Sequence, residues 1–399
     1  MNIGNIMKKR LLLISILLCS CAPAEQEANS TIHYQVNTET LTAKVVESPK
    51  FNSEILSIPE TISYNNKEYK VTSISKNSFL NNVYIKSVTM PNSISSIGYD
   101  AFRNCTNLEV VNFSTEVKVL PDHLFAGCTS LKEFINGENV ETIYKGVFRD
   151  TKLKSVIFNN IKELNINTFF NCSDLEEVTI LGEYTSLPGS FFEKCPLLKK
   201  VNLSPSLNKI DSYAFKNCSS LELFDFSNIN ELGVSSFEST SIKSASIKVN
   251  KMGKWCFYNC DNLENINVDV PVIEEKCFYD CNNLNKINID NVKHIKSQAF
   301  YNSSVKEIVI PPTVEEISSQ AFENSKLEKL SFEDNSSLKI ISRNAFYNCA
   351  LKGVLSLPSS IKSIYNNAFS NNSLEKVKLN KTTSVDNNCF DENVEIEYY

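Results

Sequence analysis

The sequence predicts a β-rich solenoid of about 15 coils that stack through a parallel β-sheet, and three observations support this fold class. A phenylalanine recurs at a mean spacing of about 22 residues, which is typical of short structural repeats. Between these anchors an alternating apolar pattern recurs, with the two-residue period of a strand that buries one face. A third segment, often opened by proline, leads to the next anchor. A unit this short cannot bury its apolar face alone, so the units must stack.

The repeated phenylalanine defines the register of the whole array. The anchors are Phe79, Phe102, Phe125, Phe148, Phe169, Phe192, Phe215, Phe237, Phe257, Phe278, Phe300, Phe322, Phe346, Phe369 and Phe390. The strand pattern that follows each anchor is Leu-x-x-Val/Ile-x-Leu/Ile, as in Leu175, Val178 and Ile180. Proline ends this strand because it has no N–H for the ladder. The position of Pro358 indicates that the strand after Phe346 is displaced by one residue.

The two ends of the array depart from the period. Residues 31–71 predict an N-terminal cap of strands with turns at Asn37-Thr38 and Asn65-Asn66. The solenoid then occupies residues 72–390, and residues 391–399 are expected to form a C-terminal closing strand.

The first 30 residues have a different composition from the rest. Basic residues precede the apolar run Leu11 to Leu18, so residues 1–20 are interpreted as a signal peptide that is too short to span a bilayer. Leu18-Cys19-Ser20-Cys21 resembles the lipobox of bacterial lipoproteins, which implies lipidation of Cys21. Residues 21–30 then predict a flexible tether after the lipidated cysteine. The alternative is an ordinary signal peptide with incidental cysteines.

Individual units also carry a family resemblance. The unit Val305-x-x-Ile308-x-Ile310-Pro311-x-x-Val314-x-x-Ile317-x-x-x-Ala321-Phe322 resembles the BspA-like, treponemal-type leucine-rich repeat. The resemblance covers roughly residues 70–390 and implies a curved, right-handed leucine-rich-repeat solenoid on a bacterial surface protein, several relatives being lipoproteins. It also implies adhesion to host extracellular-matrix or cell-surface proteins, or to other bacteria. It implies no catalytic residue and no cofactor.

Most cysteines follow the repeat. Eight lie three residues after an anchor phenylalanine, namely Cys105, Cys128, Cys172, Cys195, Cys218, Cys260, Cys281 and Cys349. A cysteine tied to one repeat position is expected to fill a small buried packing site. Cys256 and Cys277 fall in register one unit apart, so a disulfide between them or a metal site with Cys260 and Cys281 remains an alternative.

Enzymatic chemistry and nucleic-acid binding are not expected. The three histidines, His33, His123 and His294, lie in the cap and in two well-separated units, too far apart to converge. No nucleophile elbow, phosphate loop or zinc-protease motif is present. The formal net charge of -6 is spread along the chain, whereas nucleic-acid binding needs clustered Lys and Arg. We therefore expect no catalytic residue and no metal site.

The outward face of the strands is the expected binding surface. The residues two and four positions after the first Leu of each strand should form two exposed columns along the stack. These positions are mostly polar, but apolar residues occur in the N-terminal units. The predicted partner-binding residues are Val110, Asn112, Glu133, Ile135, Ile157, Glu177 and Thr179. The alternative is that these are ordinary surface aliphatic residues, or that the cap covers them.

The sequence thus predicts a cell-surface lipoprotein that presents its solenoid for protein binding, with adhesion as its role. The expected partner is a host matrix or cell-surface protein, or another bacterial surface protein. The membrane contact is expected only through the lipid anchor, on the outer membrane or cell surface. A periplasmic or envelope scaffold without an external ligand is the main alternative, and an undetected hydrolase is a remote one.

Overall fold

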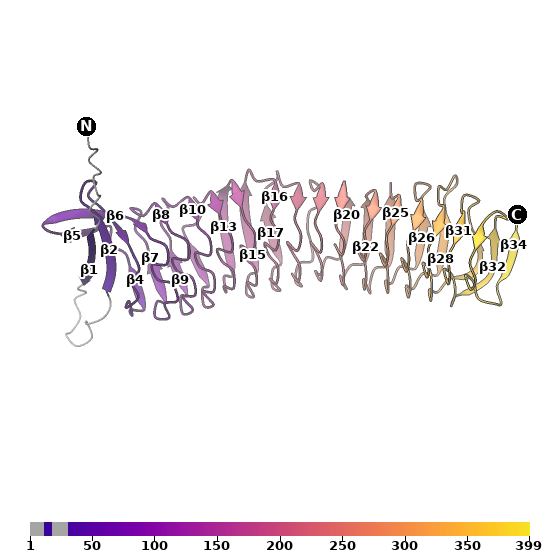
Figure 1. Ribbon diagram of the computed structural model, residues 1–399, viewed down its shortest axis with the longest axis horizontal. Coiled ribbons are helices and arrows are strands. Elements are labelled where there is room, and N and C mark those ends of the chain that lie inside the picture. The colour runs from indigo at the N-terminus through magenta and orange to yellow at the C-terminus, as the bar shows by residue number, and fades with distance from the viewer. Residues whose placement is uncertain (1–11, 18–30) are drawn as a thin grey trace, which may run out of the picture. The chain divides into compact units, whose positions relative to one another are not determined.

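The computed structural model describes residues 12–17 and 31–399, and every regular element in these residues is a β-strand (Figure 1). The chain divides into two compact units. The first unit runs to Tyr184 and includes residues 202–204, and the second comprises residues 185–201 and 205–399. Both are stacks of coils that repeat the same local structure, which confirms the predicted parallel-strand solenoid.

The N-terminal strands pair differently from the rest. Antiparallel pairs join β1 (Leu12–Leu17) to β2 (Thr31–Asn37), β2 to β3 (Thr42–Val45), and β5 (Thr61–Tyr64) to β6 (Lys67–Ile74). The turn between β5 and β6 places Asn65 and Asn66 at positive φ, as a two-residue hairpin requires. Parallel pairing of β6 with β3 and with β8 (Ser96–Ile97) then leads into the repeated coils.

Each coil contributes up to two strands, and the two kinds of strand form separate parallel sheets. The longer strands come from the Leu-x-x-Val/Ile-x-Leu/Ile segment and form the strand face. They are β4 (Ile55–Ser57), β7 (Ser87–Thr89), β9 (Val110–Asn112), β11 (Glu133–Ile135), β13 (Ser155–Ile161), β15 (Glu177–Gly182), β17 (Lys200–Leu203), β20 (Ser244–Lys248), β22 (Asn265–Asp269), β24 (Lys286–Asp290), β26 (Glu307–Ile310), β28 (Lys329–Phe332), β30 (Lys352–Ser356), β32 (Ser373–Leu379) and β34 (Glu395–Tyr398).

The shorter strands are two residues long, and the second residue of most of them is a buried aliphatic side chain. Besides β8 they are β10 (Val119–Leu120), β12 (Thr142–Ile143), β14 (Glu163–Leu164), β16 (Ser186–Leu187), β18 (Lys209–Ile210), β19 (Glu231–Leu232), β21 (Lys251–Met252), β23 (Val272–Ile273), β25 (His294–Ile295), β27 (Glu316–Ile317), β29 (Ile340–Ile341), β31 (Ser363–Ile364) and β33 (Ser384–Val385).

The anchor phenylalanines form a stacked column inside each unit. From Phe79 to Phe169 successive ring centroids lie 5.3 to 5.8 Å apart. From Phe192 to Phe390 they lie 4.9 to 5.7 Å apart, with interplanar angles of 8 to 22°. These are favourable offset-stacked distances for aromatic rings. The predicted anchors are therefore the shared core of neighbouring coils.

The backbone around each anchor explains the asparagine that often follows it. In a typical coil the residues two before and two after the anchor have positive φ, as Asp100 and Asn104 do around Phe102. Asparagine and aspartate tolerate this left-handed conformation better than most residues. The resulting turn donates backbone N–H groups to the next coil, for example from Phe102 to the carbonyl of Leu124 at 3.1 Å. Coils are thus hydrogen-bonded at the turns as well as in the sheets.

The cysteine after the anchor has a role beyond packing. Its Sγ donates to the carbonyl oxygen of the anchor phenylalanine in the preceding coil at 3.0 to 3.2 Å, in the pairs Cys105–Phe79, Cys128–Phe102, Cys172–Phe148, Cys218–Phe192, Cys260–Phe237, Cys281–Phe257 and Cys349–Phe322. In most of these coils the same carbonyl also accepts a backbone N–H from its own turn, as that of Phe102 does from Cys105 at 3.2 Å, so the thiol adds a second hydrogen bond that links neighbouring coils.

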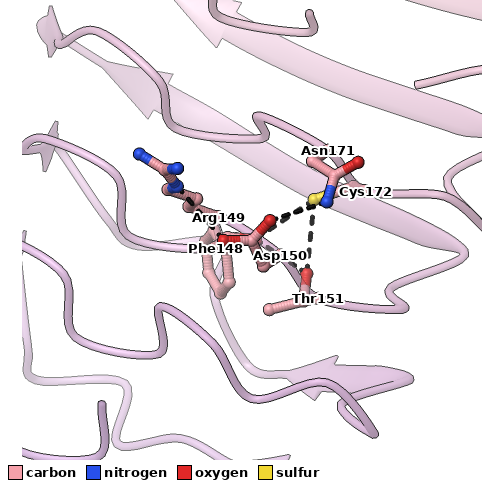
Figure 2. A network of polar contacts seen from close by, with 6 residues as sticks. All are labelled: Phe148, Arg149, Asp150, Thr151, Asn171 and Cys172. Carbon is pink, nitrogen blue, oxygen red and sulfur yellow. Dashed lines mark hydrogen bonds and ion pairs between the residues drawn. The ribbon is translucent and has the colours of Figure 1, made fainter. Parts of the chain in front are cut away.

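Figure 2 shows this arrangement where threonine replaces cysteine in one coil. The Thr151 hydroxyl donates to the carbonyl of its own anchor Phe148 at 2.8 Å, and Cys172 from the next coil donates to the same oxygen. Asn171 donates from its side-chain amide to the Asp150 carboxylate at 2.7 Å. At this position the threonine thus donates within its own coil, whereas the cysteine donates to the preceding coil.

The thiols of the repeat are buried. Of the eleven cysteines between residues 31 and 399, ten are buried and Cys349 is half-buried, and no disulfide is present among these described residues. Burial raises the pKa of Cys260 to about 11 and that of Cys277 to about 12. The predicted burial is confirmed, and these thiols resist ionisation at neutral pH.

The strand after Phe346 is displaced by one residue, as predicted. Gly353 has a φ of +72°, and the pairing of β30 with β32 shifts between Gly353 and Val354. Leu355 consequently pairs with Val377 at the inward position that other coils fill one residue earlier. Glycine at positive φ allows this bulge without strain.

We expect Phe215→Ala to destabilise the second unit by about 3–5 kcal/mol, because emptying a large core site removes burial and leaves a cavity. Phe215 is fully buried and stacks on Phe192 and Phe237 at 5.4 and 5.1 Å. Urea unfolding followed by the fluorescence of Trp255, the only tryptophan, measures the loss. The control Leu223→Ala removes a side chain that is 73% exposed and should change stability by less than about 0.5 kcal/mol. Equal stability of the two variants would contradict the anchor role.

We also expect the free energy of unfolding to fall as the pH rises from 9 to 11. An unfolded thiol loses its proton near its ordinary pKa of 9.0, whereas the buried thiols of Cys260 and Cys277 hold theirs until about pH 11 to 12. Over this interval the unfolded chain binds fewer protons, so alkali favours unfolding. Urea titrations at stepped pH measure the slope. The double variant Cys260→Ser with Cys277→Ser should show a shallower dependence, and an unchanged slope would mean that other groups cause it.

Candidate binding surface

The strand face carries the two predicted outward columns. In the second unit the pairing of β22 with β24 places Asn265 beside Lys286 and Asn267 beside Asn288. The Asn288 side-chain amide donates to the Asn267 oxygen at 2.7 Å, so neighbouring residues of one column contact each other. The columns are therefore present as ladders of side chains one strand spacing apart.

The predicted partner-binding residues begin on β9 and β11. The register places Glu133 beside Val110, and Ile135 beside Asn112. Val110 and Asn112 are half-buried, whereas Glu133 is exposed and Ile135 is 43% exposed. The amide of Asn136 donates to the Asn112 side-chain oxygen at 2.7 Å. Ile135 thus lies open to solvent in the part of the chain that the structure describes.

The remaining predicted residues lie on β13 and β15. The register places Ile157 beside Thr179, and Ser155 beside Glu177. Ile157 is 55% exposed, Glu177 is exposed and Thr179 is half-buried. No described segment covers Ile135 or Ile157.

Ile135 and Ile157 are on successive coils but not on paired strands. β11 is the last strand of the sheet β11-β9-β7-β4, and β13 begins a different sheet. β11 ends at Ile135 because Asn136 adopts a φ of +68° and Gly137 follows. No ladder of backbone hydrogen bonds therefore holds these two side chains at the distance that separates paired strands.

One exposed residue of this surface was missed. Ile55 on β4 is 68% exposed and pairs with Ser87, which pairs in turn with Val110 in the same column. The sequence places Ile55 inside the N-terminal cap, although Ser57-Ile58-Pro59 matches the strand-ending pattern of later coils. The structure thus adds one exposed aliphatic residue two coils before Val110, beyond a coil that has Ser87 in this column.

Charges frame this surface on one side. Inter-coil ion pairs join Lys86 to Glu54 at 2.6 Å and Lys132 to Glu109 at 3.2 Å, and all four side chains are about half exposed. Exposed pairs of this kind stabilise a fold little. Glu133 has no ion-pair partner among residues 31–399, so its charge faces solvent beside the aliphatic residues.

In the last coils of the second unit, charged residues of the strand face form ion pairs within the chain. Lys376 forms ion pairs with Glu395 at 2.8 Å and Glu397 at 3.4 Å, and Lys378 pairs with Glu397 at 3.3 Å. These contacts raise the pKa of Lys376 and lower the pKa of Glu397. These lysines of β32 thus help to hold β34. Substituting them would disturb the fold, so they cannot serve as a control for partner binding.

The histidines do not converge. His33 Nδ1 lies 3.0 Å from the Glu47 carbonyl, and His123 Nδ1 lies 3.6 Å from the Asp100 carboxylate. His294 Nδ1 is buried without a hydrogen-bond partner in the described chain. Among the described residues there is no group of three His, Cys, Asp or Glu side chains that could hold a metal ion.

Cys21 and the tether at residues 21–30 lie outside the described residues, as does most of the predicted signal peptide at residues 1–20. Among the residues that the structure describes, no helix is long and apolar enough to cross a membrane.

Comparisons with known proteins agree with this architecture. A leucine-rich repeat protein from Bacteroides ovatus ATCC 8483 superposes with a TM-score of 0.71 at 24% identity, over 92% of this chain and 98% of that one. A leucine-rich cell surface protein from Faecalibacterium prausnitzii A2-165 matches at 21% identity and a TM-score of 0.45, over 95% of this chain and 96% of that one. The first likeness establishes the fold. Curated proteins gave no significant match.

The family assignment rests on the sequence itself. The BspA type leucine rich repeat region (six copies) matches residues 59–176, 156–264 and 271–397, which together make up most of the chain. Solenoids of stacked leucine-rich repeats typically serve as binding scaffolds. With its repeated coils, phenylalanine column and open strand face, this chain belongs to the BspA type leucine-rich repeat family.

Proposed function

We propose that this chain is an exported, lipid-anchored surface protein that binds a protein partner through the strand face of its N-terminal coils. The observation that carries the proposal is the exposure of Ile55, Ile135 and Ile157 at 68%, 43% and 55%. The corresponding positions of most later coils hold Ser, Asn, Lys or Glu. Exposed aliphatic side chains gathered on one face are typical of protein recognition sites.

The arrangement supports protein rather than small-molecule recognition at this surface. Ile135 and Ile157 on neighbouring coils, with Ile55 three coils toward the N-terminus, offer a broad face, and Glu133 and Glu177 add charge at its border. Apolar groups at the centre and charged groups at the rim are the usual anatomy of a protein interface. The proposed partner is a host matrix or cell-surface protein, or a surface protein of another bacterium.

Lipid attachment at Cys21 would place this surface outside the membrane at the end of the tether. We expect Cys21→Ala to release the protein from the membrane fraction, because the thiol is the only proposed point of acylation. Cys19→Ala, which removes the neighbouring cysteine, is the matched control and should leave the protein in the membranes. Fractionation followed by immunoblotting measures both. Membrane retention of the Cys21 variant would refute the lipoprotein proposal, and protection from protease on intact cells would favour a periplasmic scaffold.

We expect Ile135→Asp combined with Ile157→Asp to weaken partner binding by roughly tenfold or more, because each change puts an unpaired charge into an apolar contact. The full chain is first used to capture partners from host matrix and serum, and affinities are then measured for each purified partner. The control is Val309→Asp with Val354→Asp, since these valines are 52% and 57% exposed on the strand face of the second unit. Equal weakening by both pairs would show that the N-terminal coils are not the binding site.

A further inference from the structure

The strand face of the second unit is interrupted at the coil of residues 221–226, and again between β28 and β30, which belong to separate sheets. Residues 221–226 form no strand, and β20 is consequently the edge strand of the sheet β20-β22-β24-β26-β28. The outward columns predicted to continue through Leu223 and Asp225 are therefore broken here. The shorter strands β19 and β21 still pair, so the interruption is confined to the strand face.

Side-chain volume explains the interruption. Phe224 and Phe226 occupy both inward strand positions of this coil, and their ring centroids lie 4.9 Å apart. Both also contact Phe237 at 5.1 Å, in the column where Phe237 already stacks on its neighbours. Excess volume in a packed core is relieved by moving the backbone. The next coil has the small residue Ala245 at the position of Phe224.

A hollow of about 850 Å³ lies beside this interruption. Its lining extends from Phe224 and Asp225 across Ser246 to Asn267 and then to Lys286 on β24. Because it reaches two strands beyond β20, it lies over the face of the sheet and is not merely a gap at the edge of β20. Its volume falls within the range of small-molecule sites.

The polar groups of this hollow are fixed by contacts within the chain. The backbone N–H of Ser227 donates to Asp225 Oδ1 at 2.9 Å and lowers the pKa of that carboxyl. The oxygen of the Asn267 side chain accepts from Asn288, which leaves its amide N–H₂ group available to a ligand. Ser246 adds a hydroxyl group that can both donate and accept.

The charges of the hollow balance. Asp225 contributes one negative charge and Lys286 one positive charge. Lys248, the other basic residue of the lining, forms an ion pair with Asp269 at 3.6 Å. A polyanion would need an excess of Lys and Arg, which is not present here. The ligand that matches this surface is uncharged and rich in hydroxyl groups.

We propose that this hollow binds a neutral glycan, a short run of pyranose rings lying across β20 and β22. Sugar hydroxyl groups donate and accept in the way that Asp225, Ser246 and Asn267 require. Phe224 lines the hollow, but its ring packs inward on Phe215, Phe226 and Phe237, so recognition of the sugar rests on these hydrogen bonds. A bound peptide strand would instead use the backbone edge of β20. The site is separate from the proposed protein-binding surface, because it belongs to the second unit.

An array of neutral and acidic oligosaccharides from bacterial and mammalian surfaces, probed with the full chain, tests this proposal. We expect binding to a neutral glycan, with the affinity then measured by calorimetry. Ser246→Trp should abolish binding by filling the hollow. Asn267→Ala should weaken it by roughly tenfold, as the loss of ligand hydrogen bonds does. An unchanged circular-dichroism spectrum and melting temperature confirm that the variants fold.

The matched control is Leu223→Asp. Leu223 is 73% exposed next to Phe224 but does not line the hollow, so a glycan inside should be unaffected by this change. A protein partner large enough to cover the hollow would contact Leu223 and would lose affinity. The proposal is overturned if the chain binds no glycan on the array or prefers sulfated or sialylated glycans. It is also overturned if the Ser246→Trp variant still binds the glycan. If the chain captures a protein, and both Ser246→Trp and Leu223→Asp lose that binding, the hollow belongs to a protein interface instead.

Discussion

Stacking of one phenylalanine per coil is the interaction on which the rest of each unit depends. The rings fix the rotation of every coil relative to the next, and that rotation decides which strand residues face inward. The backbone around the ring must then turn sharply on both sides, which places residues such as Asp100 and Asn104 at positive φ. The anchor carbonyl accepts an N–H from its own turn, and the cysteine of the next coil adds a second donor that links the two coils. Packing, turn chemistry and hydrogen bonding are thus consequences of one repeated side chain.

Periodicity made most of this architecture predictable from the sequence. The anchors, the outward columns and the one-residue displacement near Pro358 all follow from spacing alone, and Gly353 supplies the bulge that the displacement requires. The thiol hydrogen bond was not predictable, because a cysteine that only fills space and a cysteine that also donates a hydrogen bond give the same sequence pattern. Thr151, a hydrogen-bonding residue at the same repeat position, was the signal that this position can carry a donor.

The features that concern binding were harder to predict because they are departures from the period. The exposure of Ile135 and Ile157 agreed with the pattern, but the end of the ladder at Asn136 depends on one backbone conformation. Ile55 was missed because its coil adjoins an irregular cap. The hollow beside β20 arises from the combined volume of Phe224 and Phe226, each of which fits the pattern when taken singly. A regular array presents the same surface residues in every coil. A surface that is specific to one place must therefore come from irregularities of this kind.

The interruption between residues 221–226 and β20 also has a mechanical consequence. Across most neighbouring coils a pulling force along the stack would be shared by the longer strands, the shorter strands and the phenylalanine column. At this joint the longer strands form no ladder, so the load passes to β19 and β21, to turn hydrogen bonds such as that from the Phe215 N–H to the Ser236 carbonyl, and to the Phe215 to Phe257 stack. Force would therefore open the second unit at this joint or between β28 and β30, where the longer strands also belong to separate sheets, while the coils on either side keep their own stacking.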